Sequence, residues 1–401
     1  MLSLPHWPVL SSCLLLCTAT TLSSQAPAQT AGDSVRQRDV MDVLSRVLHG
    51  RPKLGDSIAI PPKIVISVLP AFGANPTVGF LLGVSGNAVT RLGPEETTNL
   101  STLYASVSYT TKQQFNVVSR SNLFTADNIW KLEGDWRYLD TNQPTYGLGP
   151  ALPKALESPM DFKVLRFYET VYREVTGGVL AGIGYHFNRY YDIVDKNAAL
   201  GPTPFSEYNG GATITSSSTS GFSFNLLKDA RNNPINTTRG FYARGSTRFF
   251  PRALGSEQDW GSVEMEVRAY PRLKKNVLAL WGLAWITGGK PPYLELPAIG
   301  WDYNGRTGRA YAQGRIRATD LLYGEAEYRV TLTRNGLFGA VGFLNLTSAA
   351  DATGAFQAPD PGYGLGLRIK LNKHSNTNIT IDYGFGAEGS KGVFFGTGEV
   401  F

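Results

Sequence analysis

Residues 130–138 have the sequence Trp-Lys-Leu-Glu-Gly-Asp-Trp-Arg-Tyr, in which charged residues alternate with aromatic, apolar or small ones. Successive side chains of an extended chain point to opposite faces, so one face of this stretch carries both signs of charge while the other is apolar and aromatic. The same period of two recurs at 241–249, 263–270 and 325–332. This alternation predicts β-strands that separate a charged side from an apolar side.

The composition favours an all-β protein that contacts lipid. Charged residues make up only 17% of the 401 residues, below the roughly 25% of soluble domains. The mean hydropathy is −0.14, and no apolar run approaches the roughly 20 residues of a spanning helix, which excludes a bundle of membrane helices. The net charge of +6 comes from scattered residues, so no nucleic-acid partner is expected.

Sixteen candidate strands can be assigned between residue 64 and residue 401. They lie at roughly 64–73, 76–89, 100–111, 113–125, 129–140, 162–175, 178–190, 219–228, 239–250, 258–271, 277–287, 319–331, 337–346, 362–372, 377–387 and 393–401. Connections after strands 4, 6, 10, 12 and 14 are short, whereas those after strands 5, 7, 11 and 13 are long. This sorting is typical of outer-membrane barrels, and hydrocarbon forces such a sheet to close. We therefore expect a transmembrane antiparallel β-barrel of about 16 strands, with both termini on the periplasmic side.

The beginning of the chain differs from the barrel. Residues 1–28 contain no Lys, Arg, Asp or Glu and end in Ala26-Pro27-Ala28, an A-x-A cleavage site, which indicates a secretory signal peptide. Cys13 and Cys17 both lie within this segment. The mature chain is therefore expected to have no disulfide, thiolate ligand or thiol nucleophile.

A short amphipathic helix is expected in the N-terminal segment 29–62, ahead of the barrel domain 63–401. Asp33 or Ser34 is expected to cap its start. Two interpretations stay open, a surface helix and a periplasmic plug or latch. The apolar face of the helix comprises Val40, Val43, Leu44, Val47 and Leu48, which follow helical spacing.

The sequence contains no motif for catalysis, metal binding or a cofactor. It lacks a G-x-S-x-G nucleophile elbow and a G-x-x-x-x-G-K-[ST] phosphate loop. His49, His186 and His374 have no companions at metal-ligand spacing, and no motif pairs His186 with a serine as a membrane phospholipase would require. We therefore expect no enzymatic activity and no cofactor.

Four local motifs stand out from the strand pattern. Residues 69–79 form a Pro-rich approach to a glycine-rich strand. A turn between the eighth and ninth strands carries Asp229, Arg231, Pro234 and Gly240, and in it Asp229 is expected to accept backbone N–H bonds while Pro234 fixes φ. The long loop before strand 12 contains Gly308, Arg309, Ala310, Tyr311, Gly314 and Arg315, and strand 12 contains Glu325, Glu327 and Arg329.

These motifs resemble those of the BamA/TamA-type bacterial surface-antigen superfamily of sixteen-stranded outer-membrane barrels. The resemblance implies that the long loop folds back into the lumen, where Arg309 contacts acidic groups of the inner wall. Glu327 faces inward by parity, and Glu325 is the second candidate partner. Asn345 stands where the family has an Asp and is expected to accept one bond from the guanidinium. Ala310 replaces the family's Gly, which costs steric strain if that position needs a positive φ.

The resemblance also implies a function in outer-membrane biogenesis, protein insertion or translocation, or transport, among the outer-membrane lipids of a Gram-negative bacterium. Phe401 ends the predicted final strand, and a final aromatic residue is the usual signal for the barrel assembly machinery. Segment 29–62, 34 residues long, is too short for a periplasmic POTRA domain, so a monomeric member without one is expected. Two alternatives stay open, a passive or substrate-specific channel and a scaffold for a separate periplasmic or lipoprotein partner.

Overall fold

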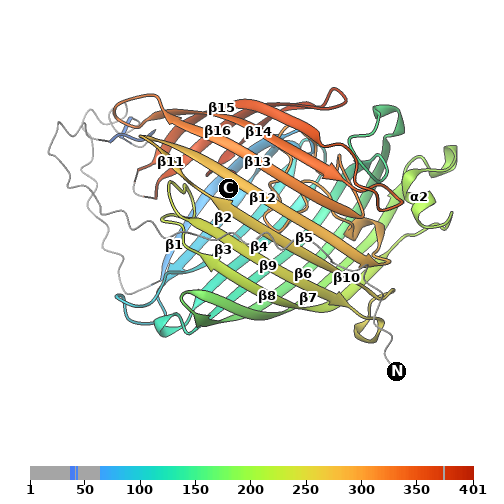
Figure 1. Cartoon of the computed structure of the whole chain (residues 1–401), viewed down its shortest axis with the longest axis horizontal. Coiled ribbons are helices and arrows are strands. Elements are labelled where there is room, and N and C mark those ends of the chain that lie inside the picture. The colour runs from blue at the N-terminus through green and yellow to red at the C-terminus, as the bar shows by residue number, and fades with distance from the viewer. Residues whose placement is uncertain (1–36, 41, 44–63, 374) are drawn as a thin grey trace.

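The computed structural model describes residues 37–40, 42–43, 64–373 and 375–401. These residues form one closed antiparallel sheet whose strands follow one another in chain order, with β1 (Val65–Asn75) meeting β17 (Lys391–Thr397) to complete the ring (Figure 1). Two segments, β10 (Trp260–Ala269) and β11 (Arg272–Leu273), both pair with β12 (Asn276–Gly289). They are parts of a single barrel strand interrupted at Tyr270 and Pro271, so the barrel has sixteen strands and the predicted fold is confirmed.

The remaining elements lie within a few residues of the predicted boundaries. The other strands are β2 (Gly79–Thr90), β3 (Ser101–Thr110), β4 (Phe115–Phe124), β5 (Trp130–Thr145), β6 (Ser158–Thr176), β7 (Val179–Asp195), β8 (Ser217–Asp229), β9 (Phe241–Phe250), β13 (Asp320–Thr331), β14 (Phe338–Ala349), β15 (Asp360–Asn372) and β16 (Thr377–Gly386). The helical turns are η1 (Ala126–Asn128), η2 (Lys154–Leu156), η3 (Ala198–Leu200), α2 (Pro204–Tyr208), η4 (Arg252–Leu254) and η5 (Tyr293–Glu295). Among the described residues, no helix is long and apolar enough to cross a membrane.

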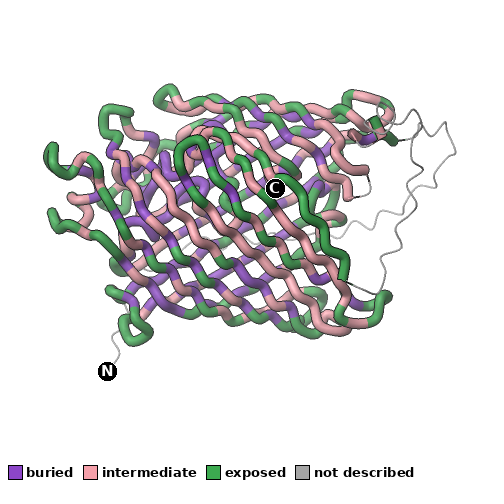
Figure 2. The backbone as a smooth tube through the Cα atoms, turned by 180° about the vertical axis from the view of Figure 1, so that it is seen from behind, coloured by how far each residue is buried: buried purple, intermediate pink, exposed green. Residues whose placement is uncertain are grey.

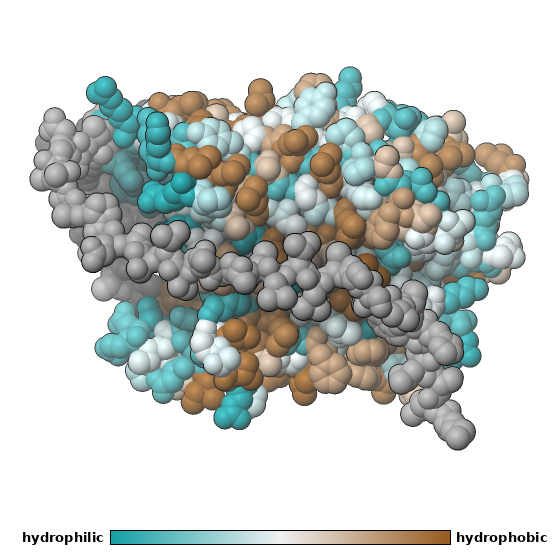
Figure 3. All heavy atoms as spheres, viewed as in Figure 1, coloured by the Kyte–Doolittle hydropathy of each residue, from teal (hydrophilic) through white to brown (hydrophobic). Residues whose placement is uncertain are grey.

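Side chains of opposite character occupy the two faces of the barrel wall. Along β6, Arg166 and Tyr172 are buried in the lumen, whereas Leu165 and Phe167 are exposed on the outside, and buried and exposed positions alternate in this way along most strands (Figure 2). Apolar side chains cover much of the outer wall, and hydrophilic ones are most frequent toward its two ends (Figure 3). A barrel in lipid needs this inverted polarity, because its outside faces hydrocarbon and its lumen is polar.

The two arginines of β6, Arg166 and Arg173, which the sequence places on opposite faces, have different surroundings. Arg166 is buried in the lumen. Arg173 is exposed on the outer wall, three residues before the strand ends at Thr176, and its guanidinium lies 5.2 Å from the centre of the Trp130 ring. A position near the strand end lets this cation reach the polar boundary of a bilayer.

The described part of the N-terminal segment lies at the end of the barrel that carries the short turns. Val40 and its neighbours Asp42 and Val43 are helical. Asp39 caps this helix, because its carboxylate accepts the N–H of Asp42 at 2.8 Å and its own N–H reaches the Asp42 carboxylate at 3.2 Å. Asp39 therefore caps the described helical turn. Residues 33 and 34, the signal peptide at 1–28 and the rest of the expected helix lie outside the described residues.

Candidate functional site in the barrel lumen

The connection between β12 and β13, residues 290–319, folds back into the lumen. Its two arms pair with each other, since Gly314 N–H donates to the Ile299 carbonyl at 2.8 Å and Ala318 N–H donates to the Pro297 carbonyl at 2.9 Å. Burial of the side chains of Ile299 and Ile316 between the arms gives the loop a small apolar core. The loop is thus a packed element rather than a loose strand connection.

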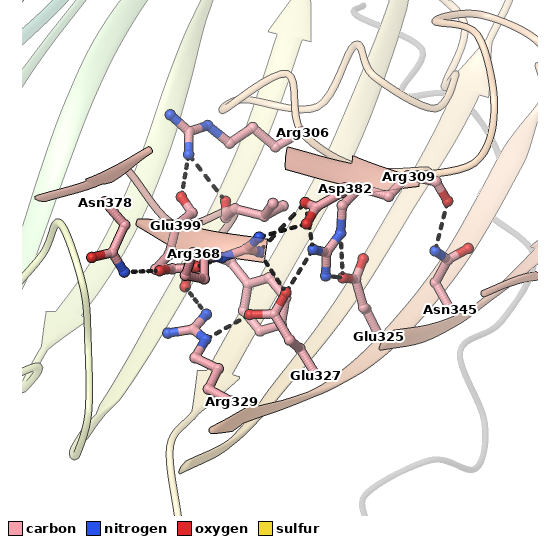
Figure 4. Close-up of polar contacts among 12 residues, drawn as sticks. Arg306, Arg309, Glu325, Glu327, Arg329, Asn345, Arg368, Asn378, Asp382 and Glu399 are labelled. Atoms are coloured by element: carbon pink, nitrogen blue, oxygen red, sulfur yellow. Dashed lines mark hydrogen bonds and ion pairs between the residues drawn. The ribbon is translucent and has the colours of Figure 1, made fainter. Parts of the chain in front are cut away.

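Arg309, near the tip of this loop, lies among three carboxylates of the barrel wall (Figure 4). Its Nη1 is 2.6 Å from Glu327 Oε2 and 3.1 Å from Asp382 Oδ2, and its Nε donates to Glu325 Oε1 at 3.0 Å. The guanidinium also lies 4.0 Å from the centre of the Phe343 ring. Arg309 and the three carboxylates are buried. Charge-assisted bonds of this kind are stronger than neutral ones, so this group, called here the Arg309 cluster, fixes the loop tip to β13 and β16.

Left-handed backbone conformations explain the glycines at positions 308 and 314 of the loop tip. Gly308 and Gly314 have φ values of 80° and 74°, and Ala310 has φ of 101° although it carries a Cβ. Ala310 packs closely on Gly384 of β16, where a Cβ would lie 2.8 Å from the Ala310 Cα. Ala310 therefore holds a left-handed backbone conformation that glycine adopts at lower cost.

Tyr311 makes a second attachment of the tip. Its hydroxyl donates to the Pro361 carbonyl at 2.6 Å and accepts the Ala387 N–H at 2.8 Å. Burial raises the pKa of Tyr311 to about 12, so the hydroxyl keeps its proton at neutral pH. Its phenol thus ties the loop to β15 and to the turn after β16.

Asn345 contacts Arg309 differently from the expectation. Its side-chain amide donates to the main-chain carbonyl of Arg309 at 2.9 Å, and it accepts no bond from the guanidinium. Arg315 is also buried, but it lies 4.0 Å from the centre of the Tyr146 ring and donates to the Leu152 carbonyl. Among the described residues, Arg315 forms no ion pair with a carboxylate.

The Arg309 cluster continues into a wider ionic network that the sequence did not reveal. Arg368 of β15 bridges Asp382 Oδ1 at 2.5 Å and Glu399 Oε2 at 2.7 Å, and Arg329 of β13 contacts Glu327 Oε1 at 2.6 Å. Strand parity places Arg368 and Asp382 on the inner face and would have identified both as candidates. The ion pair of Glu399 could not be predicted in this way, because Glu399 follows the last strand and its position depends on where the chain turns after that strand.

The last four residues, 398–401, turn into the lumen and form what is called here the C-terminal tail. The predicted strand 393–401 is wrong in this part, since β17 ends at Thr397 and Gly398 adopts φ of 79°. The Phe401 ring is buried 5.2 Å from that of Trp281, and its carbonyl accepts a bond from Arg329 at 2.7 Å. The tail is thus held by packing and by charge at the end of the lumen near the short turns (Figure 1).

The turn between β8 and β9 contains the second sequence motif. Asp229 accepts the N–H of Arg231 at 3.1 Å and is also bound by the Arg231 guanidinium at 2.7 Å. Gly240 has φ of 100°, and a Cβ there would lie 2.1 Å from the Ala230 carbonyl oxygen, so the turn requires glycine. Pro234 lies at its exposed outer part. The turn also reaches inward, where the Thr237 carbonyl accepts a bond from Arg329 at 3.0 Å.

The contact between the first and last strands is much shorter than any other contact between barrel strands. β1 and β17 share a single register pair, Ala74 with Phe395, whereas β1 and β2 share eleven pairs from Val65 to Asn75. The Phe72 and Phe395 rings stack at 5.6 Å beside this pair. Residues 65–73 of β1 have no partner in β17 within the described part of the chain. This contact is called the seam below.

Comparisons with known proteins bear on the fold. No family model matches the sequence, and no curated protein matches it. Among solved structures, BamA from Haemophilus ducreyi lacking POTRA domains 1–3 matches with a TM-score of 0.58 and 14% identity, over 84% of this chain and 70% of that one. CdiB from Acinetobacter baumannii matches with a TM-score of 0.48 and 11% identity, over 84% and 65%. The fold of this chain is therefore that of a sixteen-stranded outer-membrane barrel similar to BamA.

Proposed function

We propose that this chain is a non-enzymatic member of the BamA/TamA-type superfamily that acts in outer-membrane biogenesis, by inserting or translocating other chains through its seam. The observation that carries the proposal is the single register pair between β1 and β17. An unpaired strand edge in hydrocarbon is costly, and it is also the surface to which another extended chain can add by backbone hydrogen bonds.

The contacts inside the lumen support an openable wall rather than an open pore. The Arg309 cluster fixes the long loop across the inner wall, and the C-terminal tail lies beneath it. A cavity of about 260 Å³ separates the loop tip from the seam and is lined by Thr77, Tyr311 and Phe395. A loop fastened beside a weakly paired wall can restrain that wall, so we propose that the Arg309 cluster is a lock on the seam.

Phe401 keeps its proposed role as an assembly signal under one condition. In the folded chain its ring is buried, so another protein can bind it only before the barrel closes. The barrel assembly machinery is therefore proposed to recognise this residue during insertion, and the tail enters the lumen afterwards.

A disulfide across the seam tests the proposed function. Ala74 and Phe395 face each other in register, and directly opposed residues are close enough for a disulfide when both become cysteine. The double variant Ala74→Cys/Phe395→Cys in phospholipid vesicles is expected to lose its ability to speed the insertion of an unfolded eight-stranded barrel protein. Reduction with dithiothreitol is expected to restore that ability.

A matched control separates seam closure from the presence of a disulfide. Ser85 and Ser106 face each other across β2 and β3, which are fully paired. Oxidised Ser85→Cys/Ser106→Cys is expected to insert the client as fast as the parent chain. Equal activity of the oxidised and reduced seam variant would contradict the proposal, as would the absence of any acceleration by the parent chain.

A channel is the second candidate, because the inner wall is lined with charge that would be solvated in an open pore. Conductance across planar bilayers distinguishes the two. The proposed function predicts little steady conductance for the parent chain and brief openings for Arg309→Ala. A large, steady conductance of the parent chain would favour the channel.

A further inference from the structure

The outer wall of the barrel is hollowed on the side away from the seam. A groove of about 730 Å³ crosses the outer face of β5 to β10, and its lining is almost entirely apolar. It includes Trp130, Val171, Ile183, Phe224, Leu226 and Met265. Its size lies within the roughly 300–1,000 Å³ of small-molecule sites.

Small residues create the groove. Gly245 of β9 faces outward between Leu226 and Met265 in the register, and a Cβ built on it would meet no atom within 4 Å. Ala181 lies in the same row beside Leu226. Because an empty hollow forfeits van der Waals contact, a groove that faces hydrocarbon is filled by whatever apolar chain surrounds it.

A positive charge marks one end of the groove. Trp130 pairs with Arg173, and Arg173 pairs with Ala181, so Arg173 stands between two residues that line the groove. Arg173 is exposed and forms no ion pair with any residue that the structure describes; its guanidinium rests against the Trp130 ring at 5.2 Å. An arginine at the edge of the hydrocarbon requires water or an anion beside it.

The path of the groove, from the end of the barrel toward its middle, matches the path of a lipid from its headgroup to its acyl tail. Trp130 is the first residue of β5, at the end of the barrel with the short turns, whereas Met265 lies in the middle of β10. The row from Trp130 through Ala181 and Gly245 to Met265 therefore rises from the membrane boundary toward the bilayer centre. A headgroup at Arg173 would leave its acyl chain running along this row.

We propose that the groove binds one phospholipid of the periplasmic leaflet, with its phosphate on Arg173 and an acyl chain over Gly245. The proposal rests on the proposed location of the barrel in the outer membrane and is independent of insertion through the seam. Arg173 supplies the charge complementary to the phosphate, the aromatic face of Trp130 fits the interfacial region, and the small residues supply the width for a methylene chain.

Photochemical labelling tests this site in the full chain. The protein is reconstituted in vesicles of phosphatidylethanolamine and phosphatidylglycerol that contain a trace of phosphatidylglycerol with a diazirine in its acyl chain. Labelled peptides are identified by mass spectrometry, with co-flotation of protein and vesicles as the check on membrane insertion. Labelling is expected to concentrate on the outward residues of β8, β9 and β10 in the groove.

Two variants and two matched controls make the result decisive. Arg173→Gln removes the charge and is expected to lower groove labelling about fivefold, the effect of losing roughly one Arg–phosphate attraction at a membrane surface. Gly245→Leu fills the groove and is expected to lower groove labelling because the acyl chain loses the space it would occupy. Gly282→Leu changes an outward glycine of β12 with equally open surroundings, and Arg189→Gln changes an exposed outward arginine of β7; both are expected to leave groove labelling unchanged.

A probe without phosphate separates the headgroup from the tail. Diacylglycerol with the same diazirine chain is expected to label the groove of the parent chain weakly, and Arg173→Gln is expected to make the two probes equal. Uniform labelling around the barrel, or equal losses in Gly245→Leu and Gly282→Leu, would overturn the proposal. Failure of co-flotation would overturn the membrane location and with it the proposed function, whereas a loss of groove labelling alone would leave the seam proposal unaffected.

Discussion

The wall of β5, β6 and β7 and the seam between β1 and β17 are closed by different means. β5 and β6 share sixteen register pairs and β6 and β7 share fifteen, whereas the seam has one. Side chains near the seam add to the holding: Arg309 and Arg368 tie the loop, β13, β15, β16 and the C-terminal tail into one ionic network. On the other side of the seam, Gln313 of the same loop donates its N–H to Thr77 Oγ1, just after β1, at 2.6 Å. A backbone ladder is insensitive to side-chain identity, but such a network depends on a few residues. Opening of the barrel is therefore expected to be controlled by single side chains near the seam and not in the opposite wall.

Loss of Arg309 is expected to have the largest effect. Arg309→Ala leaves Glu325 buried without a cation, while Glu327 and Asp382 keep only Arg329 and Arg368. Removing one partner of a buried ion pair costs about 3–5 kcal/mol. The temperature at which the folded, fast-migrating form disappears on heating in detergent is expected to fall strongly. Arg315→Ala is the control, because Arg315 is buried against Tyr146 and the Leu152 carbonyl without a carboxylate partner. Equal losses in the two variants would remove the case for the Arg309 cluster.

A variant in the wall opposite the seam gives a second test of the comparison between that wall and the seam. Arg137 pairs with Asp135 on the inner face of β5, which is held by full ladders on both sides. Arg137→Ala is expected to lower thermal stability and to leave hydrogen exchange of the β1 backbone amides unchanged. Arg309→Ala is expected to speed hydrogen exchange of those amides. If both variants speed exchange in β1 alike, the seam has no special dependence on its ionic network.

Replacement of the Phe401 side chain by alanine is expected to have an intermediate effect on stability. Removing a buried phenylalanine ring costs about 3–5 kcal/mol in a rigid core, and a chain end can relax, so a loss near the lower end of that range is expected for Phe401→Ala. Phe385→Ala is the matched control, because Phe385 is an exposed aromatic residue of the outer wall. Thermal unfolding of both variants after refolding in detergent separates the packing role of Phe401 from any role in assembly. Equal melting temperatures would show that the tail does not stabilise the barrel.

The smallest effect is expected at the N-terminal helix. Lys373 Nζ lies 2.7 Å from Asp42 Oδ2 in a partly exposed pair, and such pairs contribute roughly 0–1 kcal/mol and weaken with salt. Lys373→Ala is expected to speed proteolysis of the N-terminal segment at low salt and to have no effect at high salt. Lys163→Ala removes a similar pair with Asp192 at the opposite end and is expected to leave that cleavage rate unchanged. An unchanged rate in Lys373→Ala would mean that this pair does not hold the helix.

The sequence predicted the barrel well because alternation is a local property. The predicted strands 129–140 and 319–331 were identifiable from their inward charges and correspond to β5 and β13, although β5 continues to Thr145. The sorting of loop lengths indicated that the sheet closes. Contacts of the long loop with distant strands, such as Arg309 with Asp382, could not be paired from the sequence, although parity places Asp382 on the inner face. The inward turn of Phe401 could not be predicted, because Val393 to Phe401 has the pattern of an ordinary final strand and only the luminal contacts with Trp281 and Arg329 divert it.

Hydrogen exchange in the reconstituted barrel tests the weak seam most directly. Alternate amides of an antiparallel strand point to opposite neighbours, so about half of those in residues 65–73 point toward the seam, where no residue of β17 is in register with them. We predict that these amides exchange within the first time point, while those directed at β2 and those of Phe162–Tyr172 in β6 stay protected. Equal, long-lived protection throughout β1 and β6 would contradict an openable seam.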